Sequence, residues 1–377
     1  MKTKFVSVLL VIALLLSLSF FHSCSEDEPT TPDSNALEIR VKAILDSVIN
    51  NSNVPGLVAG IWASDKGLSL VYEAGVSDLD TKEPMDAEML FRIGSNTKTL
   101  TITVLLQLVD EDSLELTDKI SKWFPDFPKA DSVTIEMITN MRSGIPEYMN
   151  SDYFQKTCTS NPKKVWLPDT LINIAVGMEY YFSPGNGYRY SNTNTYIAGR
   201  IIEMITGNTL EEEINRRIIE ELGLSNTYFI TNGVEMPGYH PRGYYESQYE
   251  ADNPDYTEYL DMSSAWAAGS AVSNLYDLKT YVEKLTSGYF LSAELQAKRL
   301  DCHQIENSPY LAGYGMGIIS FKEFYGHNGS ITGFTSIMMN SPSKKATIIL
   351  WYNCQLNDCS PTDLFFQSLL PVIYPEL

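Results

Sequence analysis

Histidine and cysteine are scarce in this sequence, and its acids outnumber its cations. The 377 residues include four His and five Cys, and neither a CxxC nor an HExxH pattern occurs. We therefore expect no metal site and no cofactor. The 27 Lys and Arg residues stand against 47 Asp and Glu, which gives a formal net charge of −20. Because phosphate binding needs clustered cations, this balance argues against a nucleic-acid partner.

Two further patterns are missing. The sequence has no G-x-S-x-G, the strand-to-helix turn that carries the nucleophile of α/β-hydrolases. It also has no internal self-similarity at periods of roughly 20–50 residues, which argues against a repeat protein. Apolar residues make up 44% and charged residues 20% of the chain, which is close to ordinary globular proteins and excludes wholesale disorder.

The longest apolar run lies at the N-terminus. Residues 5–21 are uncharged and largely apolar, and they follow Lys2 and Lys4. This order is typical of a secretory signal peptide. A single membrane-spanning helix is the alternative, since the run approaches the lower length limit for one. Cys24 follows a small residue directly after the run and resembles a bacterial lipoprotein processing site.

An acidic spacer comes next. Residues 25–35, SEDEPTTPDSN, are rich in acids, Pro and Ser, as a flexible tether would be. We predict a signal peptide over 1–23 and a lipidated Cys24 with its linker over 24–34. Acyl chains on Cys24 would anchor the protein stably in the outer membrane of the bacterial cell envelope. The acidic spacer resembles the surface-export tag of Bacteroidetes lipoproteins. Cleavage to a soluble secreted protein remains the alternative.

The remaining cysteines leave two readings open. An oxidising compartment permits disulfides, and Cys354 and Cys359 are close enough in sequence to pair around a short loop. Free, half-buried thiols are the other reading, and it applies equally to Cys158 and Cys302.

Apolar periodicity predicts strands near both ends of the chain and helices between them. We expect one domain over 35–377 of class α+β, with three α/β/α layers. An antiparallel sheet built from both chain ends has helices on both faces and carries an inserted, mostly helical lobe. The α/β lobe would span 35–110 and 262–377, and the helical lobe 111–261. The predicted strands are 56–64, 68–75, 314–320, 333–340 and 346–353, and the main predicted helices are 35–50, 95–109, 193–207, 209–223 and 361–374.

One S-x-x-K pattern stands out by its context. Ser95 opens the predicted helix 95–109, which is apolar nearly all round and therefore buried. Position i+3 puts Lys98 on the same helix face. Desolvation would lower the pKa of Lys98 and let it accept a proton from Ser95. Two other matches, Ser160–Lys163 and Ser341–Lys344, contain Pro and lie in predicted loops. The alternative is a helix-capping Ser and a Lys that extends to solvent.

Two more motifs could complete a catalytic site. In Tyr190-Ser191-Asn192 a phenol near a Lys ammonium could shuttle a proton, and Asn192 could bind a substrate amide. The alternative is a packed Tyr and a capping Asn, and Tyr148-Met149-Asn150 fits the same pattern. In His327-Asn328-Gly329-Ser330 the glycine would let substrate approach. The Ser330 N–H could then form an oxyanion hole with that of Ser95. A turn with an exposed His is the alternative there.

These motifs and their surroundings resemble the serine β-lactamase and penicillin-binding-protein superfamily, in its class C-like branch, over roughly residues 37–355. The resemblance implies that Ser95 is the nucleophile and that Lys98 and Tyr190 transfer its proton. It also implies that Asn192 and the third motif at His327 contact the substrate, and that the fold is a sheet with a helical lobe. The segments that carry it are 91–128, 133–148, 184–203, 267–278 and 314–334.

Two departures from the family pattern bear on the substrate. The third motif is His-Asn-Gly where the family has Lys-Thr-Gly, and 140–144 reads Asn-Met-Arg-Ser-Gly where a His-Thr-Ser-Gly-like run is common. We expect His327 to face a substrate carboxylate and to be only partly charged near neutral pH. Among the relatives that the resemblance suggests, His at this position is more similar to DD-peptidases, D-amino-acid peptidases and esterases.

Three functions therefore stay open. The first is a serine hydrolase that acts through an acyl-enzyme on D-amino-acid peptides or esters. The second is a class C-like β-lactamase, and the third a catalytically silent sensor or binding lipoprotein of the same fold. The partners would be a small peptide, ester or β-lactam and, through Cys24, a membrane. The Tyr-rich segment 239–259 could line a substrate or glycan surface, or it could be an ordinary loop.

Overall fold

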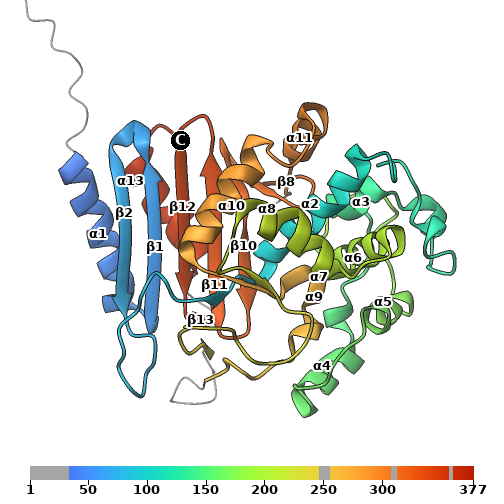
Figure 1. Cartoon of the computed structure of the whole chain (residues 1–377), viewed down its shortest axis with the longest axis horizontal. Coiled ribbons are helices and arrows are strands. Elements are labelled where there is room, and N and C mark those ends of the chain that lie inside the picture. Colours follow the sequence, from blue (N-terminus) through green and yellow to red (C-terminus); the bar gives the residue numbers. More distant parts are fainter. Residues whose placement is uncertain (1–33, 246–254, 307–311, 356–359) are drawn as a thin grey trace, which may run out of the picture.

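The computed structural model describes residues 34–245, 255–306, 312–355 and 360–377 (Figure 1). The predictions for the signal peptide, Cys24, the linker up to residue 33 and Cys359 lie outside these ranges. Within them, no helix is long and apolar enough to cross a bilayer.

The core of the fold is one antiparallel sheet of eight strands in the order β2-β1-β12-β11-β10-β9-β8-β7. The sheet joins two N-terminal strands to strands from the last quarter of the chain, as the sequence predicts. Its strands are β1 (Gly56–Ala63), β2 (Leu68–Gly75), β7 (His303–Gln304), β8 (Gly313–Tyr314), β9 (Ile319–Phe321), β10 (Phe324–Ile331), β11 (Phe334–Ser341) and β12 (Ala346–Tyr352).

Both faces of the sheet are covered because its central strands are apolar on both sides. On β1, Leu57, Ala59 and Ile61 pack in one core, and Val58 packs in the other. The first core lies under α1 (Ser34–Asn51) and the C-terminal helical segment 361–373. The second core lies under α10 (Leu275–Ser287) and the helices beyond it. Figure 1 shows α1 beside the edge of the sheet and α10 across its front.

Helices are the main regular structure between β2 and β7, and they extend the molecule beyond the sheet (Figure 1). The helices not yet given are α2 (Thr97–Asp110), α3 (Ile135–Thr139), α4 (Asp152–Ser160), α5 (Pro168–Val176), α6 (Asn192–Thr206), α7 (Leu210–Ile214), α8 (Glu220–Leu222), α9 (Trp266–Gly269), α11 (Ala293–Leu300), α12 (Pro361–Asp363) and α13 (Leu370–Ile373). Two small sheets complete the described fold, β3 (Phe91–Arg92) with β6 (Ala271–Ser273) and β4 (Tyr228–Phe229), and β5 (Tyr244–Tyr245) with β13 (Cys354–Gln355).

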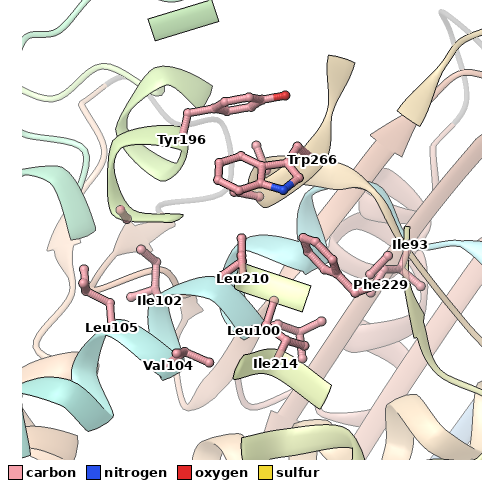
Figure 2. Packing of buried hydrophobic residues seen from close by; sticks show 14 of the residues in the cluster. Ile93, Leu100, Ile102, Val104, Leu105, Tyr196, Leu210, Ile214, Phe229 and Trp266 are labelled. Carbon is pink, nitrogen blue, oxygen red and sulfur yellow. The ribbon is translucent and has the colours of Figure 1, made fainter. Parts of the chain in front are cut away.

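Helix α2 lies at the centre of the larger core. Its side chains Leu100, Ile102, Val104 and Leu105 are all at most 1% exposed, and they pack with residues from α6, α7 and α9. Figure 2 shows these side chains beneath Trp266. Because mostly apolar residues surround the first turns of the helix, its polar side chains there, including Lys98, are buried and desolvated, which matters for the site below.

Two local predictions need correction. The segment 324–331 is a full strand, although its Gly and polar residues do not have the pattern of one. Residues 314–320 are not one strand, because a turn separates β8 from β9 and Gly317 there has a φ of 63°. The cap of α10 is Asn274, whose side chain accepts from the Asp277 backbone N. Thr209 and Glu212 form a capping box at the start of α7.

Candidate active site

Ser95 lies in a tight 3₁₀ turn, Gly94–Asn96, between β3 and α2. The helix therefore begins two residues later than the sequence predicts. Gly94 has a φ of 54°, and a Cβ there would lie 2.8 Å from the Ser330 backbone N. Ser95 is partly exposed although the residues on both sides of it are buried. The turn thus presents one hydroxyl group to the surface from a buried frame.

Lys98 lies one helical turn below, as the S-x-x-K spacing predicts. Its side chain is fully buried, and Nζ lies 2.9 Å from Ser95 Oγ and 2.7 Å from the Ala268 carbonyl oxygen. Burial lowers the pKa of Lys98 to about 7, although the Glu147 carboxylate opposes this shift. Near neutral pH a substantial fraction of Lys98 is therefore an uncharged amine that can accept the Ser95 proton.

Tyr190 contacts both of these residues. The Lys98 Nζ lies 4.9 Å from the centre of its ring, and its phenol oxygen interacts with the Ser95 hydroxyl, which lowers the Tyr190 pKa. Burial raises the pKa of Tyr190 well above the ordinary value, and the bond to Ser95 only partly offsets this rise. Tyr190 is therefore a neutral phenol in the resting site, and it can pass a proton without carrying charge itself.

Glu147 is a residue of this site that the motifs do not reveal. The residue is 8% exposed, and its carboxylate accepts hydrogen bonds from the backbone N of Asn192, at 2.6 Å, and of Met149, at 3.1 Å. Burial raises the pKa of Glu147, whereas these donors and Lys98 lower it. The same carboxylate thus holds the start of α6 in place and stabilises the Lys98 ammonium.

Asn192, the first residue of α6, is partly exposed beside these groups. Its Nδ2 lies 3.2 Å from the Met149 sulfur, which is a weak acceptor. A substrate carbonyl could therefore displace this contact at little cost, and the role of Asn192 as a substrate contact stays a prediction.

His327 lies at the site, but its charge state differs from the prediction. The side chain is fully buried in β10, with its ring centre 6.1 Å from that of Tyr190. Burial first, and the Lys98 charge second, lower the pKa of His327 to about 3. The expectation of a partly charged imidazole near neutral pH is therefore wrong, because an exposed reference pKa does not apply to a ring without solvent contact.

Gly329 has a different purpose from the one the sequence suggests. A Cβ on it would lie 2.0 Å from the Ile93 carbonyl oxygen and 2.9 Å from Asn96 Nδ2. The glycine thus makes room for the turn that carries Ser95, rather than for substrate. This close approach brings the Ser330 backbone N beside Gly94, next to the nucleophile.

We expect Gly329→Ala to destabilise the fold and the site together. The methyl group would force β10 away from the turn, which typically costs about 1–3 kcal/mol of unfolding free energy. Thermal denaturation and the rate of Ser95 acylation measure the two effects. Gly177→Ala is the matched control, since a Cβ there meets its nearest atom at 3.7 Å. Equal melting temperatures for the two variants would contradict the contact.

The competing motif matches lie elsewhere in the structure. The Ser160 hydroxyl donates to the Lys156 carbonyl at the exposed end of α4, and the Ser341 hydroxyl bonds that of Ser343. Tyr148 is buried, and its hydroxyl donates to the Ser264 carbonyl. Among the described residues, no cluster of His, Cys, Asp and Glu could hold a metal ion.

The chain is similar in sequence to curated proteins of known families. Residues 41–365 match the family model described as Beta-lactamase. Penicillin-binding protein 4* of Bacillus subtilis is 24% identical over 78% of this chain and 67% of its own length. Protein flp of Staphylococcus aureus is 22% identical over 85% of this chain and 64% of its own length. The chain thus spans about two thirds of the length of these relatives.

Solved structures with the same fold cover nearly all of the chain. A D-stereospecific amidohydrolase from Streptomyces is 28% identical and superposes with a TM-score of 0.78. The match covers 92% of this chain and 100% of the amidohydrolase chain. D-amino acid amidase from Ochrobactrum anthropi, in complex with D-phenylalanine, is 26% identical, covers 91% of this chain and 100% of its own, and has a TM-score of 0.79.

Proposed function

The chain belongs to the Beta-lactamase family, and its structural relatives include amide hydrolases. We propose that it is a serine hydrolase that cleaves amides or esters of D-amino acids through an acyl-enzyme on Ser95. The observation that carries the proposal is the contact of the Ser95 hydroxyl with a fully buried Lys98 whose pKa is lowered to about 7. A structural serine and lysine have no need of this arrangement.

The proposed reaction follows from these contacts. Lys98 accepts the Ser95 proton while Oγ bonds to the substrate carbonyl carbon. The developing oxyanion would be met by the backbone N–H groups of Ser95 and Ser330. The proton passes through Tyr190 to the leaving amine or alkoxide as the carbonyl carbon releases it. Water then attacks the acyl-enzyme, with the same groups accepting its proton and returning one to Ser95.

Two observations favour D-amino-acid amides and esters over β-lactams as substrates. The structural relatives named above are a D-stereospecific amidohydrolase and a D-amino acid amidase. The third motif also provides no fixed cation, because His327 is buried and neutral. A substrate carboxylate would therefore lack the charge-assisted hydrogen bond that a Lys supplies.

A substrate panel tests the proposal. The purified protein would be assayed with D- and L-phenylalanine amide, short-chain p-nitrophenyl esters, D-Ala-D-Ala peptides and nitrocefin. We expect turnover of the D-amide and the esters, and a much lower kcat/KM for the L-amide and for nitrocefin. Faster hydrolysis of nitrocefin than of the D-amide would favour a β-lactamase. Binding without turnover of any compound would favour a silent binding protein.

The pH dependence should report the state of Lys98. If the neutral amine is the base, kcat/KM should rise with pH through about 7, the lowered pKa of Lys98. Glu147→Gln removes a charge that raises this pKa, so the rise should move to lower pH in the variant. The measurement is kcat/KM for a neutral ester, whose own charge is constant. Glu136→Gln, at an exposed position on α3, is the control and should leave the profile unchanged. A shift to higher pH in Glu147→Gln would contradict the assignment.

A further inference from the structure

The two ring nitrogens of His327 have different partners, and these partners define its tautomer. Nδ1 lies 2.6 Å from the Asn328 carbonyl oxygen, which can only accept, so Nδ1 carries the proton. The imidazole is neutral, so Nε2 has a lone pair. The Tyr314 hydroxyl lies 3.2 Å from Nε2 and is therefore the donor.

Tyr314 is held in place for this contact. It is 1% exposed on β8, and its ring packs edge-on against His327 at 5.8 Å and against Tyr190 at 6.0 Å between ring centres. Burial keeps its pKa well above the ordinary value, so that the phenol remains a donor. The three catalytic motifs do not include this residue, although it begins the segment 314–334 that resembles the family.

Several ionisable groups surround this pair. Lys98 on α2 and Tyr190 before α6 are near His327. Tyr188, Cys302 and Arg299 are near Tyr314. A protonated His327 would place a second charge near Lys98 and oppose its uptake of the Ser95 proton. A neutral His327 with a free lone pair would be a second acceptor for the Tyr190 hydroxyl, whose ring centre lies 6.1 Å from that of His327.

We propose that Tyr314 is a positioning residue of the site. Its hydrogen bond to Nε2 occupies the imidazole lone pair, fixes His327 as the neutral Nδ1–H tautomer, and leaves the Tyr190 hydroxyl to Ser95. The third motif then presents a neutral, fully bonded ring beside the nucleophile. This inference rests on the proposed function, since it assigns Tyr190 to proton transfer.

The test combines a spectroscopic and a kinetic measurement on Tyr314→Phe, which keeps the ring and removes the donor. In protein with ¹⁵N-labelled histidine, His327 is assigned by comparison with His327→Gln. In the unmodified protein, Nε2 should show the signal of a hydrogen-bonded lone pair that does not titrate between about pH 5 and 8. In Tyr314→Phe this signal should move to the position of a free lone pair. The rate of Ser95 labelling by a fluorophosphonate should fall about tenfold, as expected for the loss of one neutral hydrogen bond.

A double-mutant cycle separates positioning from general stability. If Tyr314 acts through His327, adding Tyr314→Phe to His327→Gln should slow labelling little further. Tyr281→Phe is the control, because this buried phenol donates instead to Thr99 Oγ1, at 2.9 Å. It should leave the His327 signals unchanged. Additive effects of Tyr314→Phe and His327→Gln, or an Nε2 signal that Tyr314→Phe does not move, would overturn the inference. If the fluorophosphonate labels neither the unmodified protein nor any variant, the proposed function fails. The histidine spectrum then still decides whether Tyr314 donates to His327.

Discussion

A Ser95→Ala protein should take up no fluorophosphonate or penicillin and should hydrolyse no ester, while its melting temperature stays close to that of the unmodified protein. The loss of activity follows because Ser95 supplies the oxygen that bonds to the acyl group. The small effect on stability follows because only one hydroxyl is lost, from a partly exposed side chain.

Mass spectrometry of the labelled protein provides the decisive measurement. One label should map to the peptide that contains residues 92–98. The chain supplies its own controls in Ser160→Ala and Ser341→Ala, which remove the serines of the other S-x-x-K matches and should leave labelling intact. Labelling that persists in Ser95→Ala, or that maps to either control serine, would refute the assignment.

The parts of the site that follow from helix geometry could be predicted from the sequence. Lys98 lies three residues after Ser95, and this spacing alone places the two side chains on one face. The apolar surroundings of α2 are visible in the sequence as well, and they account for the lowered pKa of Lys98. Likewise, the two-sided apolar pattern of 56–63 was sufficient to predict a sheet covered on both faces.

The parts that depend on long-range contacts could not be predicted in this way. Lys98 contacts a backbone carbonyl, that of Ala268, and no side-chain pattern can indicate which carbonyl lies there. Glu147 accepts hydrogen bonds from two backbone N–H groups, which no sequence pattern reveals. In the sequence it therefore cannot be distinguished from an ordinary surface acid. The charge of His327 was predicted wrongly because the residue is buried in strand 324–331. The glycines in this segment do not have the pattern of a strand, so its burial was not expected.

Lys98→Ala and Tyr190→Phe should each lower acylation by a factor of about 10²–10⁴, the usual contribution of a positioned proton-transfer group. Lys98→Ala removes the base that contacts the Ser95 hydroxyl at 2.9 Å. Tyr190→Phe keeps the ring over the Lys98 ammonium, at 4.9 Å, and removes only the hydroxyl. Single-turnover acylation by a neutral ester measures both effects without a contribution from deacylation.

The double variant distinguishes a relay from two independent structural roles. If the Ser95 proton moves through Lys98 and Tyr190 in turn, the second substitution should add little, because the first has already interrupted the path. The chain contains a matched pair elsewhere: Lys164 Nζ donates to Tyr153 at 2.9 Å and lies 5.1 Å from the centre of its ring. Lys164→Ala and Tyr153→Phe remove the same chemical groups at the surface and should leave acylation unchanged. Effects of Lys98→Ala and Tyr190→Phe that multiply in full would show that at least one of them supports the site only by packing.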